Sequence, residues 1–510
     1  MLARTLGYGL SGVSGFAVKV EVYSATGLPM LEIIGLPDAS VKESRDRVSA
    51  AIVNSGFTMP VAKLTVNLAP ADLRKEGPAF DLPIAVSILM ASGQMEGMDL
   101  TNVLMLGELS LDGSLHPVRG ALPMVISASE AGIEEIILPE GNAEEIACIQ
   151  NLRVHPAKNL RQVVEHLKGR ETIPVQEQRS YSDVVASVRC AVDMAQVQGQ
   201  TGARRALEVA ASGGHNLLMV GTPGSGKTML ARCLPGILPP LTFAESLETT
   251  RIHSIAGRLA PGSGLMAERP FCAPHHSASV ASIIGGGTNA KPGEVSLAHN
   301  GVLFLDELPE FQRNTLEALR QPLEDGVVNV TRIHNQAQYQ SSFMMVASMN
   351  PCPCGFYGSK TKKCRCSPKD IRRYLDRISG PLLDRIDIQI EVDAVPVKEI
   401  SEGGASESSA KVGERVRRVR ELQQARYAQE GIHCNAQLSA AQSKKYCPMT
   451  EAATNLLHMA VERMGMSMRA YGRVIKVART IADLDGAETI DTTHVAEAIQ
   501  YRELDGKYWR

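Results

Sequence analysis

Short apolar runs alternate with segments of helical periodicity through the first third of the chain. Apolar residues at positions 16, 18, 20 and 22 repeat with the period of two that a half-buried strand shows. Residues 40–53 then have helical periodicity, and Ser40 and Glu43 have the spacing of an N-terminal capping box. Further strands are predicted at 64–68, 103–109 and 135–139, and further helices at 80–90 and 121–131. This alternation predicts a complete α/β domain.

The middle of the chain contains three apolar runs that predict buried strands of a parallel sheet. They cover residues 217–220, 302–305 and 343–349. A helix is predicted before the first run, at 201–212, and a β-hairpin before the third, at 327–341. Helical periodicity then continues towards the C-terminus, at 411–429, 450–464, 468–484 and 492–502. The pattern predicts a second α/β domain followed by a small helical domain.

A glycine-rich segment follows the first of these central strands. It has the pattern G-x-x-x-x-G-K-T and consists of Gly221, Thr222, Pro223, Gly224, Ser225, Gly226, Lys227 and Thr228. A strand before such a loop and a helix after it are the context in which backbone N–H groups surround a phosphate. Lys227 is then expected to reach the β- and γ-phosphates, and the Thr228 hydroxyl to ligate Mg²⁺. The segment predicts an ATP site, with a glycine-rich turn that binds nothing as the alternative.

Two other strands end in polar residues. Asp306 and Glu307 follow the 302–305 strand, at the carboxyl end where ligands bind in open α/β sheets. Asp306 is expected to hold Mg²⁺, and Glu307 to orient and deprotonate an attacking water. Asn350 follows the 343–349 strand. An acidic turn and an Asn-Pro turn without chemical roles are the alternatives.

Length and composition limit the class of protein. A chain of 510 residues is too long for one core, which favours about three domains. A hydrophobic content of 44% with 21% charged residues is typical of soluble globular proteins. The N-terminus lacks a signal-peptide pattern and no apolar run reaches the length of a membrane span, so we expect a cytoplasmic protein. The net charge of −2 restricts nucleic-acid contacts to local basic patches.

Four of the ten cysteines form a cluster. Cys352-Pro353-Cys354 is followed, after nine residues, by Cys364-Arg365-Cys366. Two such pairs can supply four thiolates to a tetrahedral Zn²⁺, with free or redox-active thiols as the alternative. Cationic residues lie within and after the cluster: Lys360, Lys362, Lys363, Arg365, Lys369, Arg372 and Arg373. This density favours contact with a phosphate backbone over a merely solvated charged loop.

The N-terminal region resembles the Lon-protease-like domain, which is related to the ribosomal protein S5 fold. The resemblance rests on residues 75–79, 106–113 and 117–121. Active members use a Ser–Lys dyad, and the matching positions here are Ala79 and, approximately, Leu122. Neither side chain can attack a carbonyl or accept a proton. The resemblance implies a degenerate domain that is not a peptidase.

The central region resembles the AAA+ ATPases of the magnesium-chelatase and MCM branch. Residues 380–387, G-P-L-L-D-R-I-D, match the motif that carries the arginine finger in that branch. The resemblance implies that Arg385, with Arg377 as its substitute, reaches into a neighbouring subunit's ATP site, and therefore that the protein forms a homo-hexameric ring. It also implies that Asn350 is sensor 1, which holds the attacking water near the γ-phosphate.

The same resemblance implies roles for a second arginine and for two inserted segments. Arg469 opens a predicted helix at the position of sensor 2, with Arg473 as the second choice and a surface arginine as the alternative. Residues 249–269 and the hairpin at 327–341 resemble the helix-2 insert and the pre-sensor-1 hairpin, which face the pore in helicases. Arg332 and His334 at the hairpin tip are therefore candidate DNA contacts, although an ordinary solvated turn is the alternative.

Three further segments, at 269–279, 293–301 and 350–355, resemble the YifB/ComM family of magnesium-chelatase-like proteins, and the similarity spans nearly the whole chain. It implies an ATP- and Mg²⁺-dependent helicase that acts on single-stranded or branched DNA, drives branch migration and promotes integration of DNA in natural transformation. The alternative is a metal-insertion chaperone like magnesium chelatase. A chelatase motor needs a partner, which often carries a D-x-S-x-S signature, and this chain has none. His275 and His276 are interpreted as structural or pore-lining.

The predicted fold is an α/β AAA+ P-loop core with a C-terminal helical lid, preceded by a Lon-like (S5-like) α/β domain without the Ser–Lys dyad. The expected parts are the Lon-like domain at 1–170, a linker at 171–185, the AAA+ core at 186–400 with the four-cysteine insertion at 352–366, a linker and charged helix at 401–445, and the lid at 446–510.

Overall fold

The computed structural model describes residues 1–95, 97–188, 190–260, 263–287, 290–331, 336–359, 362–395 and 406–509. These residues fall into two units. Unit 1 takes in Met1–Ser187, Thr242–Ala267 and Ile333–Tyr339, and unit 2 takes in Val188–Leu241, Glu268–Arg332 and Gln340–Arg510, each as far as it is described. No helix in the described ranges combines the length and the apolar character needed to cross a membrane.

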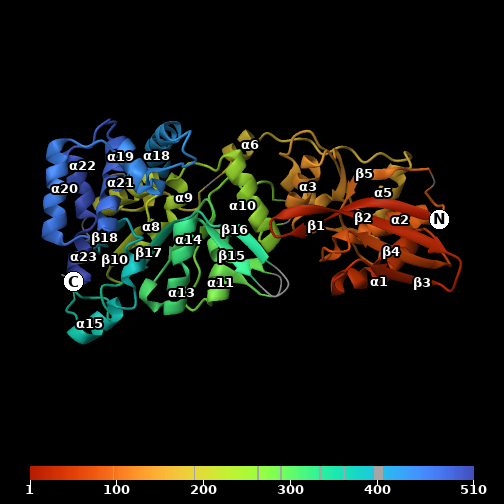
Figure 1. The fold of residues 1–510 in the computed structure, drawn as a ribbon, viewed down its shortest axis with the longest axis horizontal. Coiled ribbons are helices and arrows are strands. Elements are labelled where there is room, and N and C mark those ends of the chain that lie inside the picture. Colours follow the sequence, from red (N-terminus) through yellow and green to blue (C-terminus); the bar gives the residue numbers. More distant parts are fainter. Residues whose placement is uncertain are drawn as a thin grey trace. The chain divides into compact units, whose positions relative to one another are not determined.

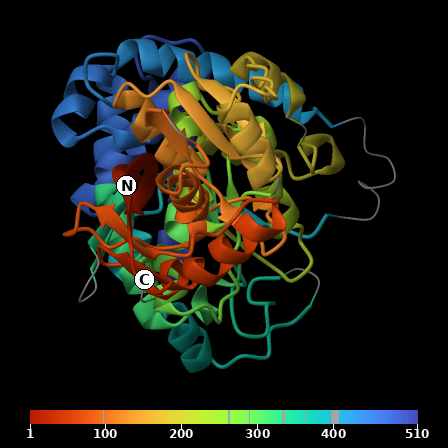
Figure 2. The same ribbon diagram turned by 90° about the vertical axis from the view of Figure 1, so that its right-hand side faces the viewer.

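A mixed seven-stranded sheet lies at the centre of unit 1, and the strands of this sheet are red to orange in Figures 1 and 2. The strand order is β3-β4-β2-β1-β5-β8-β9. Strand β2 pairs antiparallel with β1 and β4, and the other neighbours are parallel. The strands are β1 (Leu2–Ser11), β2 (Ser14–Ala25), β3 (Met30–Ile34), β4 (Lys63–Ala69), β5 (Leu100–Met105), β8 (Glu135–Pro139) and β9 (Arg153–Ala157). The sequence pattern predicted β2, β4, β5 and β8 but not β1, β3 or β9.

Helices cover both faces of this sheet. Successive residues of a strand point to opposite faces, and in β8 Ile137 packs in one core while Ile136 and Leu138 pack in another. The first core includes residues of α1, α2 and α5, and the second includes residues of α3 and α4. The helices are α1 (Ala39–Asn54), α2 (Asp81–Ala91), α3 (Ala121–Glu130), α4 (Glu140–Ile146) and α5 (Leu160–Leu167). Unit 1 is therefore an α/β domain, as predicted, and helices on the two faces of its sheet make three layers.

Two local features of unit 1 bear on the sequence predictions. Ala79 and Leu122 are both buried in the second core, so apolar side chains fill the positions that match the protease dyad. The predicted N-cap Ser40 is wrong, because α1 already begins at Ala39. Asp38 is the cap instead, and its carboxylate accepts a hydrogen bond from the Val41 N–H at 2.8 Å.

Helix α10 (Phe243–Ala256) belongs to unit 1 although its sequence lies within the predicted ATPase core. It packs against α3. The Ser254 hydroxyl accepts a hydrogen bond from the Gly120 N–H at 3.1 Å and donates one to the Glu145 carboxylate at 3.2 Å. Burial raises the pKa of Glu145, and hydrogen bonds from Asn142 and Ser254 act in the opposite direction. Within the segment predicted as a helix-2 insert, the described residues up to Ala267 thus belong to unit 1.

A parallel five-stranded sheet lies at the centre of unit 2, in the order β11-β14-β17-β10-β18. The strands are β10 (Leu217–Gly221), β11 (Phe271–Cys272), β14 (Val302–Leu305), β17 (Met344–Met349) and β18 (Ile388–Val392). Strands β10, β14 and β17 are buried throughout, as their continuous apolar runs predict. Because the strands are parallel, the glycine-rich loop, Asp306 and Asn350 follow them at one edge of the sheet.

Helices pack around this sheet and then form the C-terminal lid. In Figure 1 the blue helices α20, α21 and α22 lie together, and one core connects them with β10 and α7. The longer helices of this unit are α7 (Thr201–Gly213), α18 (Ser409–Arg426), α20 (Glu451–Met464), α21 (Met468–Leu484) and α22 (Thr492–Gln500). The shorter ones used below are α8 (Lys227–Arg232), η3 (Leu308–Glu310), α13 (Arg313–Ala318), α14 (Arg320–Asp325), α15 (Pro368–Leu375) and α16 (Gly380–Leu383).

Candidate nucleotide site

The glycine-rich loop joins β10 to α8, as predicted. Gly224 and Gly226 have φ angles of 78° and 90°, in the left-handed region that favours glycine. Gly221 lies so close to β18 that a Cβ there would come within 2.2 Å of the Val392 carbonyl oxygen. The buried Ser225 Oγ has no hydrogen-bond partner among the described residues. The backbone of this loop has the form that surrounds a phosphate in other proteins.

Lys227 begins α8 and turns back beneath the loop. Its Nζ donates hydrogen bonds to the carbonyl oxygens of Gly221 and Thr222, at 2.8 and 2.9 Å. The same Nζ lies 3.4 Å from Asn350 Oδ1. Burial lowers the pKa of Lys227, and two nearby carboxylates act in the opposite direction. The ammonium group is thus held between the loop and the residue predicted as sensor 1.

Asp306 faces the start of α8 from the end of β14. Its Oδ2 accepts a hydrogen bond from Thr228 Oγ1 at 3.0 Å. Its Oδ1 accepts hydrogen bonds from the Ser348 hydroxyl and, at 3.1 Å, from the Glu307 N–H. Carboxylate and hydroxyl oxygens are the ligands that Mg²⁺ prefers, and here two of them converge beside the phosphate loop. The residues present therefore fit ATP with Mg²⁺, and Ser348 supports them in a way that no sequence pattern indicates.

Glu307 turns the chain from β14 into η3, with a φ of 53° that is unusual for a residue other than glycine. Its Oε2 lies 3.5 Å from Nδ1 of His276. The His276 ring in turn lies against that of His275, with centroids 4.0 Å apart. The sequence does not indicate this contact, because only the pairing of β11 with β14 brings the segment after β11 to Glu307.

Arg385 and Arg469 lie in one cluster of charges. Arg385 is 7% exposed, and its Nη2 forms an ion pair with Glu324 Oε2 at 2.5 Å. Hydrogen bonding from Arg385 lowers the pKa of Glu324, and the charge of Arg469 contributes to the same shift. Arg469 Nη1 lies 3.9 Å from Asp384 Oδ2. In the described part of the chain, no residue of the glycine-rich loop is a hydrogen-bond or ion-pair partner of either arginine.

Arg473, the second choice for sensor 2, is engaged in a buried network. It forms an ion pair with Asp387. Asp387 Oδ2 lies 3.0 Å from His215 Nδ1, and His215 Nε2 lies 2.8 Å from Thr480 Oγ1. Burial alone would raise the pKa of Asp387, but Arg473 and His215 outweigh it and hold that pKa below its usual value. The network connects the starts of β10 and β18 to α21, which disfavours Arg473 as a residue that reaches a nucleotide.

The four clustered cysteines come together directly after Asn350. The Sγ separations are 3.4 Å for Cys352–Cys354, 3.7 Å for Cys352–Cys364 and 3.6 Å for Cys354–Cys364, and all four sulfurs, including that of Cys366, lie within 4.8 Å. Four sulfurs at about 2.3 Å from a tetrahedral Zn²⁺ would be about 3.8 Å apart. Backbone N–H groups of Tyr357 and Cys366 donate to Cys352 and Cys364, as the outer partners of metal ligands do. The donor set fits a structural Zn²⁺.

The cysteine loop packs against the glycine-rich loop. Gly355 has a φ of 82°, and a Cβ on it would lie 2.6 Å from the Pro223 side chain. Cys352 is fully buried, two residues after Asn350. The cluster therefore fixes the segment that carries Asn350 beside Pro223, a contact that the sequence did not indicate.

The predicted DNA contacts divide into two groups. Three of them lie outside the described residues, namely Arg332, His334 and Lys360. The strands that flank the first two, β15 (Val327–Thr331) and β16 (Gln336–Gln340), form the predicted hairpin. The remaining three are exposed on the cysteine loop, namely Lys362, Lys363 and Arg365. These residues stay candidates.

Comparison with known proteins extends the similarity over nearly the whole chain. The family model "Magnesium chelatase, subunit ChlI" matches residues 193–400, "Subunit ChlI of Mg-chelatase" matches 20–142, and "Magnesium chelatase, subunit ChlI C-terminal" matches 406–502. The chain is 43% identical to competence protein ComM of Haemophilus influenzae over 97% of this chain and 96% of that protein. Identity and coverage are the same for the uncharacterized protein YifB of Salmonella typhimurium.

A shorter similarity connects the chain to Lon proteases. Lon protease 2 of Thermus thermophilus is 28% identical over 30% of this chain and 20% of its own length. This agrees with the Lon-like architecture predicted for the N-terminal unit. The three magnesium-chelatase matches and the near-complete alignment with two relatives show that the chain belongs to the YifB/ComM family of magnesium-chelatase-like AAA+ proteins.

Proposed function

We propose that this protein is an ATP-driven, ring-forming DNA motor, specifically a branch-migration helicase that promotes integration of DNA in natural transformation. One observation supports the proposal that the protein is a motor. Four residues of one chain converge, namely Lys227, Thr228, Asp306 and Asn350. Arg385 lies in a separate cluster of charges. Such an arrangement is half of a site, and a neighbouring subunit completes it. The process is proposed because a relative that aligns over nearly its whole length is named competence protein ComM.

Each residue of the half-site has a distinct task in this proposal. ATP with Mg²⁺ supplies the phosphate bond that is cleaved. The loop and Lys227 bind the phosphates, and Thr228 and Asp306 hold the metal ion. Glu307 orients and deprotonates the attacking water, and Asn350 fixes its position.

The two arginines act on the neighbour's nucleotide. The Glu324 side chain that pairs with Arg385 is 61% exposed, and the Arg469 side chain is 66% exposed. A phosphate of the neighbouring subunit can therefore replace Glu324 as the partner of Arg385. An arginine supplied in this way stabilises charge that develops in the transition state. The proposed assembly is a homo-hexamer that encircles single-stranded or branched DNA.

The deciding experiment measures ATP-dependent unwinding of forked and three-stranded DNA by the wild type and by Lys227→Ala. We expect unwinding by the wild type, stimulation of its ATPase by DNA, and loss of both in the variant. If the wild type hydrolyses ATP but neither binds nor responds to these DNAs at low salt, the DNA motor is excluded.

The alternative is a metal-insertion or remodelling chaperone, because the family models that match are those of magnesium chelatase. A chelatase motor acts on a partner that holds the porphyrin, so its ATPase should respond to such a partner. ATPase stimulated by DNA alone favours the helicase.

A further inference from the structure

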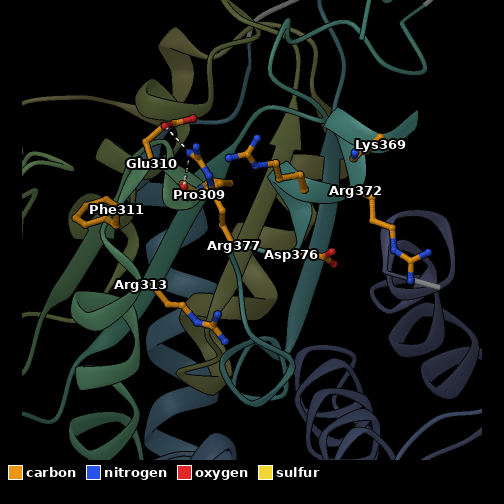
Figure 3. A pocket seen from close by; sticks show the side chains of 9 residues that line it. Pro309, Glu310, Phe311, Arg313, Lys369, Arg372, Asp376 and Arg377 are labelled. Carbon is orange, nitrogen blue, oxygen red and sulfur yellow. Dashed lines mark hydrogen bonds and ion pairs between the residues drawn. The ribbon is translucent and has the colours of Figure 1, made fainter. Parts of the chain in front are cut away.

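A basic pocket of about 680 Å³ lies beside the proposed hydrolysis site, in unit 2. The segment from Pro309 to Arg313, in η3 and the start of α13, forms one wall. Helix α15 and the two residues after it form the other, as Figure 3 shows. Neither wall belongs to the ATP half-site, and the proposed function does not use the pocket.

The pocket has an excess of unpaired positive charge. Five cationic side chains line it, against the two carboxylates of Glu310 and Asp376: Arg313, Lys369, Arg372, Arg373 and Arg377. Arg377 is neutralised, because its Nη1 contacts Glu310 Oε2 at 2.7 Å, and Figure 3 shows this pair joined by a dashed line. The other four have no ion-pair partner in the described part of the chain. This local excess of positive charge favours the binding of an anion.

The spacing of the charges favours a chain of phosphates over a single small anion. Lys369, Arg372 and Arg373 stand at i, i+3 and i+4 on α15, on the face opposite the buried Tyr374 and Leu375. Cations one helical turn apart, about 5 Å, together with Arg313 on the facing wall, can meet several phosphates of one strand. Helix α15 starts two residues after Cys366, with Ser367 as its N-terminal cap, so the cysteine cluster fixes the start of this basic face.

Both walls are connected to the residues proposed for hydrolysis. Arg377 Nη1 also donates to the Pro309 carbonyl oxygen, at 3.1 Å. Pro309 and Glu310 form η3, for which Glu307 is the N-terminal cap. On the other wall Tyr374 is buried, which raises its pKa, and the nearby Asn350 backbone acts on that pKa in the opposite direction. Movement of α15 would therefore also displace Glu307 and Asn350.

We infer that this pocket binds backbone phosphates of the nucleic acid and that Arg377 transmits their binding to η3 and Glu307. The inference rests on the proposed function, since it names where the DNA is held and how it stimulates hydrolysis. The ligand is a nucleic-acid strand, recognised through its charge and without regard to sequence.

The first test compares Arg372→Gln/Arg373→Gln with Arg417→Gln/Arg418→Gln, which removes the same charge from exposed positions of α18. Binding of forked DNA is measured over a range of salt concentrations. For the pocket variant we expect an affinity loss of about tenfold or more at low salt, and a slope of log affinity against log salt that is smaller by about 2. The control variant should retain the wild-type slope.

The outcomes separate the pocket from the proposed function. If the wild type binds no DNA, the DNA motor itself fails. If the wild type binds DNA and the pocket variant matches the control, the pocket inference is overturned while the motor stands. Binding of a fluorescent ATP analogue checks that each variant is folded, and Arg313→Gln/Lys369→Gln replaces the first variant if it is not.

The second test uses Arg377→Lys, which keeps the charge but cannot contact Pro309 and Glu310 as a guanidinium does. We expect DNA affinity within about threefold of the wild type, while the ratio of ATPase rates with and without DNA falls at least about fivefold. A wild-type ratio in this variant would rule out Arg377 as the connection.

Discussion

At the residue scale, the proposed role of Glu307 as a base is the one that a single substitution tests most directly. Its carboxylate stands at the end of β14, beside Asp306 and within 3.5 Å of His276. Glu307→Gln keeps the size of the side chain but removes the base. We expect ATP to bind normally and hydrolysis to fall by about 10²-fold or more. Single-turnover hydrolysis and ATP-analogue binding measure the two effects, and Glu317→Gln on α13 is the control for loss of a nearby carboxylate.

Wild-type turnover in Glu307→Gln would remove this residue from the chemistry. The variant has a second expected property, because a ring that binds ATP without cleaving it cannot complete its cycle. Its complex with forked DNA should therefore dissociate more slowly in ATP than that of the wild type. Dissociation measured against excess competitor DNA checks this.

At the residue scale, the sequence alone could predict which polar groups follow the strands. It could not predict which residues, distant in the same sequence, those groups contact. The loop, Asp306 and Asn350 each follow an apolar run, and parallel strands end at a common edge, so their proximity follows from periodicity. The pairing of Arg385 with Glu324 depends instead on how α14 and α16 pack. No local pattern encodes such a contact. The same is true of His276 and Glu307.

At the scale of elements, the Asp387 network should hold the lid to the sheet. Asp387→Asn removes the charge that Arg473 and His215 face inside the protein. Leaving one member of a buried ion pair unmatched costs about 3 kcal/mol. We therefore expect a lower thermal midpoint for unit 2 at neutral pH. Asp46→Asn, at an exposed ion pair in unit 1, should change the midpoint little.

The pH dependence of this stabilisation has a definite sign. The pKa of Asp387 is held below its ordinary value of 3.8 in the folded chain. Its contribution is therefore fully present above the pKa of the unfolded chain and is lost as pH falls through the folded pKa. The difference between wild type and Asp387→Asn should stay constant between about pH 6 and 8. A difference that vanishes within that window would contradict the assignment.

The cysteine cluster makes a prediction about the nucleotide site. Metal analysis should find one Zn²⁺ per chain and less in Cys364→Ser, because four thiolates are needed for a tetrahedral site. Since Gly355 packs on Pro223 and Asn350 precedes Cys352, metal loss should also weaken ATP hydrolysis in the absence of DNA. Cys190→Ser, outside the cluster, should keep both metal and activity. A metal-free wild type, or full ATPase in the metal-free variant, would contradict this.

Element boundaries were predictable where one local signal dominated. Strands β10, β14 and β17 were found because they are buried on both faces and read as continuous apolar runs. The cap of α1 was misplaced by two residues because Asp38 and Ser40 are both good caps and only the backbone decides between them. The membership of α10 in unit 1 depends on packing with α3, which its own sequence does not reveal.

At the scale of the whole molecule, the proposed function predicts active sites that form between subunits, with Lys227 from one subunit and Arg385 from its neighbour. Lys227→Ala and Arg385→Ala should each abolish ATP hydrolysis, for different reasons. Co-expressed with different tags, the two variants are expected to form mixed rings. An intact Lys227 then faces an intact Arg385 at about a quarter of the interfaces, if subunits mix at random.

We therefore expect mixed rings of Lys227→Ala and Arg385→Ala to recover about a quarter of the wild-type ATPase rate. Mixed rings of Lys227→Ala with the double variant Lys227→Ala/Arg385→Ala contain no intact lysine and should recover nothing. If Arg385 served the ATP site of its own chain, the first mixture would be as inactive as the second. Recovery in the first mixture alone would show that the finger acts across the interface, because no single chain in that mixture has both residues.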